Sequence, residues 1–192
     1  TADGARGYAS VHYQDGDKWK GDGKQRTFMV NARGVLPLGG GTELDGYISY
    51  SDRAEQDYQD LNLEMIGRLG YDWDNFGPSN YLLAVQVADI AANRGETGTT
   101  PLNPAAGTTY PAPIASADDA YYDASGLRKD TLASLGLTVP VGETGKFSIK
   151  GYYHENDGQG TWGTPYLASP SGVPMSIRTT EYDIKRKGFF AS

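Results

Sequence analysis

Two stretches of alternating residues constrain the fold of this chain more than any other feature. Residues 27–38 and 42–50 place apolar side chains at every second position, and the tight turn Gly39-Gly40-Gly41 joins them. A period of two is typical of a β-strand with one apolar and one polar face. The two stretches therefore predict an antiparallel hairpin that is apolar along one face.

The same alternation recurs and predicts four further strands. The six expected strands cover about residues 5–14, 27–38, 42–51, 127–141, 146–155 and 176–192. The last strand is less regular. We expect its apolar row to contain Tyr182, Ile184, Gly188 and Phe190, interrupted by Arg186.

The connections between these strands alternate in length. In order they are a polar loop, the glycine turn, a long insertion, a short turn and a second polar loop: 15–25, 39–41, 52–125, 142–145 and 156–174. Long connections at one end of an antiparallel sheet and tight turns at the other are typical of an outer-membrane barrel. A soluble β-sandwich produces the same alternation of side chains, but its long and short loops are not expected to be separated at opposite ends of the sheet. We therefore predict an all-β fold, a fragment of an antiparallel transmembrane β-barrel with tight turns on the periplasmic side.

Tyrosines on the apolar parity support this orientation. Tyr13, Tyr50 and Tyr153 fall at the outer ends of the three outward strands. Aromatic rings collect at that level in membrane barrels. We expect these tyrosines to belong to an aromatic girdle.

The insertion at 52–125 is the longest connection, and the acidic residues are concentrated in it. It contains 12 acidic and 3 basic residues. Residues 57–69, with Asp57 as the cap, and residues 79–93 have helical spacing, whereas 96–119 has no period. We expect one or two short helices; the first is either a lid over the barrel mouth or a packed element, since an apolar stripe usually faces a core.

Composition excludes several classes of function. The net charge of −7 argues against nucleic acid as a partner, and the absence of Cys excludes disulfides and thiolate sites. No Ser/His/Asp arrangement, phosphate loop or carboxylate pair is apparent, so we predict neither an enzyme nor a cofactor. Because the chain starts without Met or a signal sequence and stops within a strand pattern, we expect a piece of a longer protein.

Several segments resemble the barrel region of TonB-dependent outer-membrane receptors, most closely the large receptors of sphingomonad-like proteobacteria. The resemblance is carried by residues 46–53, 57–61, 69–74, 127–142, 152–160 and 176–184. It implies a 22-stranded barrel closed by an N-terminal plug, which takes up iron chelates, vitamins or glycans with energy from the TonB complex. The implied partners are that complex, the plug and remaining strands, outer-membrane lipid and lipopolysaccharide, and an extracellular ligand.

Loop side chains are the candidates for ligand contact, since exposed aromatic rings stack on sugars or chelates. The candidates are Trp19, Tyr58, Asp60, Trp73, Trp162 and Tyr166. The alternative for each aromatic residue is packing within its loop. The acidic insertion disfavours anionic chelates and tolerates neutral glycans or cations.

Neither the aspartates of the first polar loop nor the two histidines form a recognisable metal site. Asp15, Asp17 and Asp22 lack the ligand order and closing Glu of an EF-hand, so we predict no metal site. His12 and His154 fall on the polar parity, where hydrogen bonding is the expected role. The alternatives to the receptor are a passive porin or other outer-membrane barrel, and a soluble glycan-binding β protein.

Overall fold

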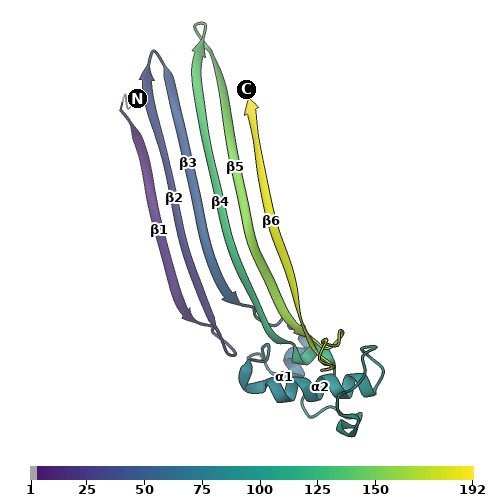
Figure 1. Ribbon diagram of the computed structural model, residues 1–192. Helices are drawn as coiled ribbons and strands as arrows, with labels where there is room; N and C mark the ends of the chain where they lie inside the picture. The colour runs from purple at the N-terminus through teal and green to yellow at the C-terminus, as the bar shows by residue number, and fades with distance from the viewer. Residues whose placement is uncertain (1–3) are drawn as a thin grey trace.

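The computed structural model describes residues 4–192, in which six strands form a single antiparallel sheet (Figure 1). The strands are β1 (Arg6–Asp17), β2 (Lys24–Gly39), β3 (Thr42–Gln56), β4 (Tyr122–Val141), β5 (Gly145–Thr164) and β6 (Ser176–Ala191). Each strand pairs with the next in the chain, so β1 and β6 form the two edges. The all-β prediction and the alternation of short and long connections are confirmed.

The strands extend further toward the long-loop end than the alternation predicted. β4 already begins at Tyr122, and β5 continues to Thr164. Trp162 therefore lies within β5, and the expectation that it sits in a loop was wrong. The reason is backbone pairing: β5 continues to pair with β6 as far as Thr164, which satisfies its polar groups where the side chains no longer alternate.

The register sorts the side chains onto two faces, because directly paired residues point to the same side. The apolar face carries Val11, Tyr13, Phe28, Val30, Leu36, Leu44, Ile48, Tyr50, Leu135, Leu137, Ile149, Tyr153 and Phe189. The polar face carries Arg6, Arg33, Asp45, Tyr47, Arg53, Arg128, Asp130, Lys150, His154, Asn156, Tyr182 and Arg186.

The register corrects the expected faces of β6. Arg186 pairs with His154, and Tyr182 pairs with Gly158, which places both on the polar face. Ile184 and Phe190 share this parity, so the expected apolar row of β6 is wrong. Phe189 takes its place on the apolar face, opposite Gly151. A shift of one residue exchanges the two faces of a strand, and only pairing with β5 decides it.

The buried core lies in the insertion rather than on the sheet. The buried apolar side chains of residues 4–192 fall between Phe76 and Ala120, except for Pro165, Pro174 and Met175 in the β5–β6 loop. In contrast, Val11, Ile48 and Leu135 on the apolar face are 69%, 46% and 60% exposed. The sheet thus presents a broad apolar surface that the described chain does not cover.

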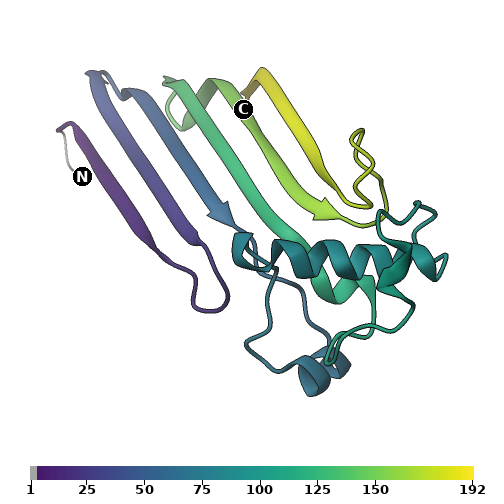
Figure 2. The same ribbon diagram turned by 60° about the horizontal axis from the view of Figure 1, so that its bottom comes forward.

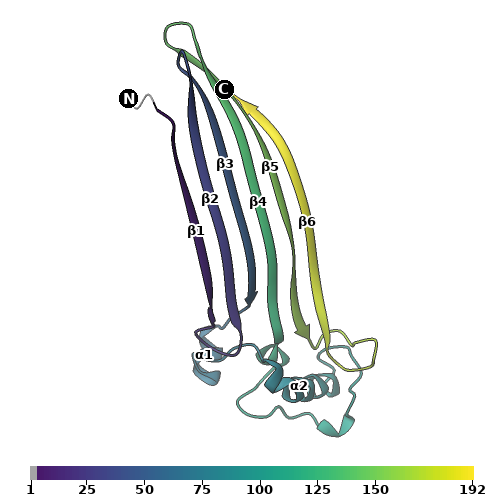
Figure 3. The same ribbon diagram turned by 60° about the vertical axis from the view of Figure 1, so that its left-hand side comes forward.

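The insertion lies at the long-loop end of the sheet, opposite the tight turns (Figures 1 and 2). It contains α1 (Leu63–Leu69) and α2 (Tyr81–Asn93), with short 3-10 turns η1 (Pro78–Asn80), η2 (Pro104–Ala106) and η3 (Ala117–Ala120). Figure 3 shows the strands curving together along their length, with the insertion gathered at one end.

The first helix is shorter than predicted. It begins after Asn62, whose side chain accepts a hydrogen bond from the Met65 amide, and it ends at Gly70. Asp57 is therefore not its cap, because Asn62 satisfies the free amide at the helix start. Tyr58 and Asp60 precede the helix in a segment without regular secondary structure. The second helix agrees with its predicted span except for a first 3-10 turn.

No helix within residues 4–192 is long and apolar enough to cross a membrane.

Candidate binding site at the loop end of the sheet

A buried ion pair joins the β1–β2 loop to the insertion. Lys18 Nζ lies 2.5 Å from Asp74 Oδ2, and the two side chains are 1% and 2% exposed. Lys18 also donates to the Asp57 carbonyl at 2.8 Å, while Asp74 Oδ1 accepts the Gln59 amide at 2.6 Å. These additional hydrogen bonds offset the cost of burying both charges. No sequence pattern distinguished Lys18 or Asp74 from other loop charges.

Gly21 allows this loop to approach the Asp74 carboxylate. Its φ of +65° lies in the left-handed region, and a Cβ added there would lie 2.6 Å from the Asp74 Cβ. Next to it, the Ser79 hydroxyl donates to Asp22 Oδ2 at 3.1 Å. The glycine-rich loop is therefore docked on the insertion along residues 21–22.

Three aromatic rings form an outer aromatic cluster beside the ion pair, consisting of Trp19, Tyr58 and Tyr71. The Trp19 ring centroid lies 5.7 Å from that of Tyr58 and 5.4 Å from that of Tyr71. Lys18 Nζ lies 4.7 Å from the centroid of Tyr58. Trp19 is 59% exposed. The structure thus places Trp19 on the outer surface, with its ring tilted against that of Tyr58.

Tyr58 also lines a hollow of about 530 Å³, which we call the loop cavity. Its walls are Asp57, Tyr58, Gln59, Asp60, Met65, Asn75, Asp118, Tyr121, Ala124, Gly160, Thr161 and Trp162. The cavity lies between the insertion and the ends of β4 and β5. It brings together three of the predicted contact residues, Tyr58, Asp60 and Trp162.

Asp118 organises one wall of the loop cavity. The hydroxyls of Tyr166 and Tyr121 both donate to Asp118 Oδ1, at 2.7 Å and 2.9 Å. Burial, together with the bond to Asp118, raises the pKa of Tyr121 to about 12 and raises the pKa of Tyr166 above its ordinary value. Both hydroxyls therefore stay protonated at neutral pH, and Tyr166 contacts the cavity wall through Asp118.

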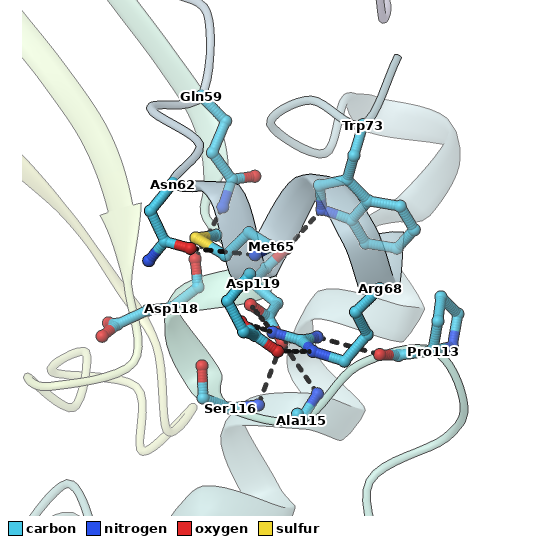
Figure 4. Close-up of polar contacts among 11 residues, drawn as sticks. Gln59, Asn62, Met65, Arg68, Trp73, Pro113, Ala115, Ser116, Asp118 and Asp119 are labelled. Carbon is cyan, nitrogen blue, oxygen red and sulfur yellow. Dashed lines mark hydrogen bonds and ion pairs between the residues drawn. The ribbon is translucent and has the colours of Figure 1, made fainter. Parts of the chain in front are cut away.

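Arg68 holds α1 against the returning chain (Figure 4). Its Nη1 and Nη2 donate to Asp119 at 2.7 Å and 3.2 Å, and Nη1 also donates to the Pro113 carbonyl at 2.9 Å. Burial alone would raise the pKa of Asp119. Hydrogen bonds from Arg68 and from the amides of Ala115 and Ser116 hold that pKa below its ordinary value instead. This pairing positions Met65, which lies on α1, in the cavity wall.

Trp73 belongs to the core of the insertion rather than to the loop cavity. Its indole N–H donates to the Asp119 carbonyl at 2.8 Å, and its ring lies 5.7 Å from that of Phe76. Gln59, which sequence reasoning missed, does line the cavity. Its amide nitrogen donates to the Asp118 carbonyl at 2.7 Å, while its Oε1 is buried without a hydrogen-bond partner among the described residues.

The loop cavity suits a ligand that donates hydrogen bonds. Its carboxylates and amides offer acceptors, and Tyr58, Tyr121 and Trp162 offer ring faces or edges. Neutral polyhydroxylated ligands and cations match such a wall, whereas free anions are repelled. Within residues 4–192 no group of three or more His, Asp or Glu side chains is arranged to hold a metal ion.

Comparison with protein-family models, with curated proteins and with solved structures finds no match.

Proposed function

We propose that the chain forms part of an outer-membrane β-barrel, and that this barrel is a TonB-dependent receptor for a scarce nutrient such as an iron chelate, a vitamin or a glycan. The observation that carries the proposal is the exposed apolar face of the sheet. A soluble protein would have to cover this face, since contiguous exposed apolar surface on this scale marks an interaction with protein or lipid.

The height of the apolar band suits a bilayer. On β2 it runs from Phe28 to Leu36. Eight residue steps of about 3.4 Å at a tilt of about 40° correspond to about 20 Å, close to the apolar band of about 25 Å in membrane barrels.

The loop-side boundary of the band is marked by tyrosine hydroxyls. Tyr13 donates to Asp15 at 3.2 Å, and Tyr153 donates to Glu155 at 2.8 Å, in both cases two residues along the same strand. Rings on the apolar side with hydroxyls directed to charged residues are suited to a membrane interface. Lys187 is paired with Tyr153 and lies at the same boundary, where its long side chain can extend toward the interface.

The polar face suits a water-filled interior. Arg33 Nε lies 2.8 Å from Asp45, which also pairs with Lys150. Nearer the loops, Asp130 accepts from Asn156 at 2.7 Å and contacts His154 at 3.0 Å. Six strands with two free edges require further strands at β1 and β6 for closure, whichever chain supplies them.

The loop cavity and the insertion favour a receptor over a passive porin. Both lie at the long-loop end, where an extracellular ligand would arrive. Ligand capture there, followed by release past a plug, needs energy from the TonB complex. A porin needs neither the capture site nor that energy.

Two measurements on the full-length protein test the proposal. It should fractionate with the outer membrane, require detergent for extraction and show heat-modifiable mobility in gels. Uptake of its nutrient should stop when TonB or the proton-motive force is removed. Uptake that persists would indicate a porin, whereas a monomer that is soluble without detergent would contradict any membrane barrel.

A further inference from the structure

Two arginines face each other on the polar face of the sheet without a carboxylate partner. Arg53 of β3 is paired directly with Arg128 of β4. Within the described chain neither makes a salt bridge. Like charges directly opposite in a sheet are unfavourable. The pair therefore resembles an anion-binding site.

Several other cationic side chains on this face are paired with acidic side chains within the sheet. Arg6 pairs with Glu43 at 2.8 Å, Arg33 and Lys150 share Asp45, and His154 contacts Asp130. Arg53 and Arg128 differ from these because they are two cations paired directly with each other.

Tyr182 provides a third donor at this position. Arg128 Nε donates to the Tyr182 hydroxyl at 3.1 Å, and the Arg128 Cζ lies 5.6 Å from the centroid of the ring. Because the hydroxyl oxygen accepts this bond, its own hydrogen remains available to an anion. The contact also orients the guanidinium of Arg128.

A glycine makes the contact between Tyr182 and Arg128 possible. Tyr182 lies on β6 and Arg128 on β4, and the residue between them on β5 is Gly158. A Cβ at Gly158 would lie 3.0 Å from Tyr182 Cε2 and 2.2 Å from the Leu127 carbonyl oxygen. The tyrosine thus reaches across a whole strand through a position that has no side chain.

The three donors line a hollow of about 610 Å³ on the polar face. Its walls are Met29, Ser51, Arg53, Arg128, Asp130, Asn156, Tyr182 and Ile184. Asp130 is already engaged by His154 and Asn156. The hollow lies closer to the tight turns than the loop cavity does, since Gly160 and Trp162 of the cavity follow Asn156 of the hollow along β5.

We propose that Arg53, Arg128 and Tyr182 bind the oxyanion group, carboxylate or phosphate, of a small solute. Guanidinium groups present paired N–H donors that match both groups, and the tyrosine hydroxyl adds a further donor. This site is separate from the loop cavity, whose carboxylates repel anions. It also stands independently of the receptor proposal, because it requires only the polar face of the sheet.

The test is calorimetric titration of the full-length protein, purified in detergent and in an amine buffer, with inorganic phosphate and separately with citrate. The wild type should bind at least one of them saturably, and the one that binds identifies the group. Arg53→Gln and Arg128→Gln should each weaken binding by about tenfold or more, the range for a lost charged hydrogen bond. Gly158→Ala should weaken binding by displacing both Tyr182 and the β4 backbone at Leu127 and Arg128.

Matched variants separate this effect from misfolding or general charge. Arg186→Gln removes a positive charge from the same face of β6 and should leave affinity unchanged. Arg53→Lys keeps the positive charge but loses the paired N–H donors of the guanidinium group. It should therefore fold like the wild type and still bind the anion more weakly. Absence of saturable binding to both anions, or equal affinity in the Arg53→Gln/Arg128→Gln double variant, would overturn the proposal. Neither result bears on TonB-dependent uptake, which is measured separately.

Discussion

Lys18 Nζ lies 2.5 Å from Asp74 Oδ2 with both side chains almost fully buried, and this pair joins the first long loop of the sheet to its helical insertion. The two residues lie far apart in the sequence and on separate connections. Their contact brings Tyr58 against Trp19 and so shapes the outer aromatic cluster next to the loop cavity.

Lys18→Met should release the β1–β2 loop, because it leaves the Asp74 carboxylate buried without its cation. Removing one partner of a buried pair typically costs about 3 to 5 kcal/mol. The expected result is faster limited proteolysis within residues 18–23 of the protein in detergent. Replacing both partners, in Lys18→Met/Asp74→Leu, should restore much of the protection. Equal cleavage of the single and double variants would contradict this account.

Ile48→Arg should impair insertion into a bilayer, because Ile48 lies within the apolar band. A charge at mid-depth on the lipid face of a membrane barrel costs about 2 to 4 kcal/mol. Folding of the full-length protein into lipid vesicles, followed against urea, measures the loss. Ser49 is the next residue on β3 and points to the polar face, so Ser49→Arg introduces the same side chain there and serves as the control. Similar losses in both variants would argue against a lipid-facing side.

Acid should loosen α1 through Asp119. Because Arg68 and two amides hold the pKa of Asp119 below its ordinary value, the pairing stabilises the fold above the ordinary carboxyl pKa of 3.8. That stabilisation is lost as the pH falls from about 4 through the folded-state pKa. Proteolysis near Arg68 should therefore increase below about pH 4.

Asp119→Asn is the matched variant for this pH effect. It should be cleaved faster than the wild type at pH 7, and it should show a smaller further increase in acid. A wild-type cleavage rate that does not change between pH 7 and pH 3 would exclude the proposed contribution of Asp119.

Tyr58→Ala and Trp162→Ala should weaken binding of neutral oligosaccharides if the loop cavity is the capture site. Loss of a central aromatic contact typically costs more than 1 kcal/mol, so the dissociation constant should rise by about fivefold or more. Titration of a panel of neutral disaccharides and trisaccharides measures it. Tyr8→Ala, on the polar face of the edge strand, is the control. Unchanged affinity in both cavity variants would place capture elsewhere.

Local pattern predicted most of the sheet. The period of two in residues 27–38 and 42–50 was enough to locate β2 and β3 and the faces of both. The glycine turn between them and the next short turn fixed which ends of the strands lie together. Helix α2 was also visible, because its apolar residues and the glycine beyond it are local features.

Features that depend on contacts between distant parts of the sequence were not predicted. The faces of β6 came out reversed because its side chains do not alternate cleanly, and only the His154–Arg186 pairing decides them. Trp162 was assigned to a loop because strand pairing, not side-chain character, extends β5. Of the six predicted contact residues, the cavity contains Tyr58, Asp60 and Trp162, while Trp73 lies in the core.

The sequence by itself therefore determined the antiparallel strands, their tight turns and the apolar face of most of them, since these depend on side chains a few residues apart. The tertiary structure alone decided the docking of Lys18 on Asp74 and the meeting of Arg53, Arg128 and Tyr182. The meeting of the arginines and the tyrosine depends on strand register, which is set by backbone pairing across the whole sheet. The docking of Lys18 on Asp74 depends on how the loops pack together. No single segment contains that information, because each partner lies on a different strand or loop.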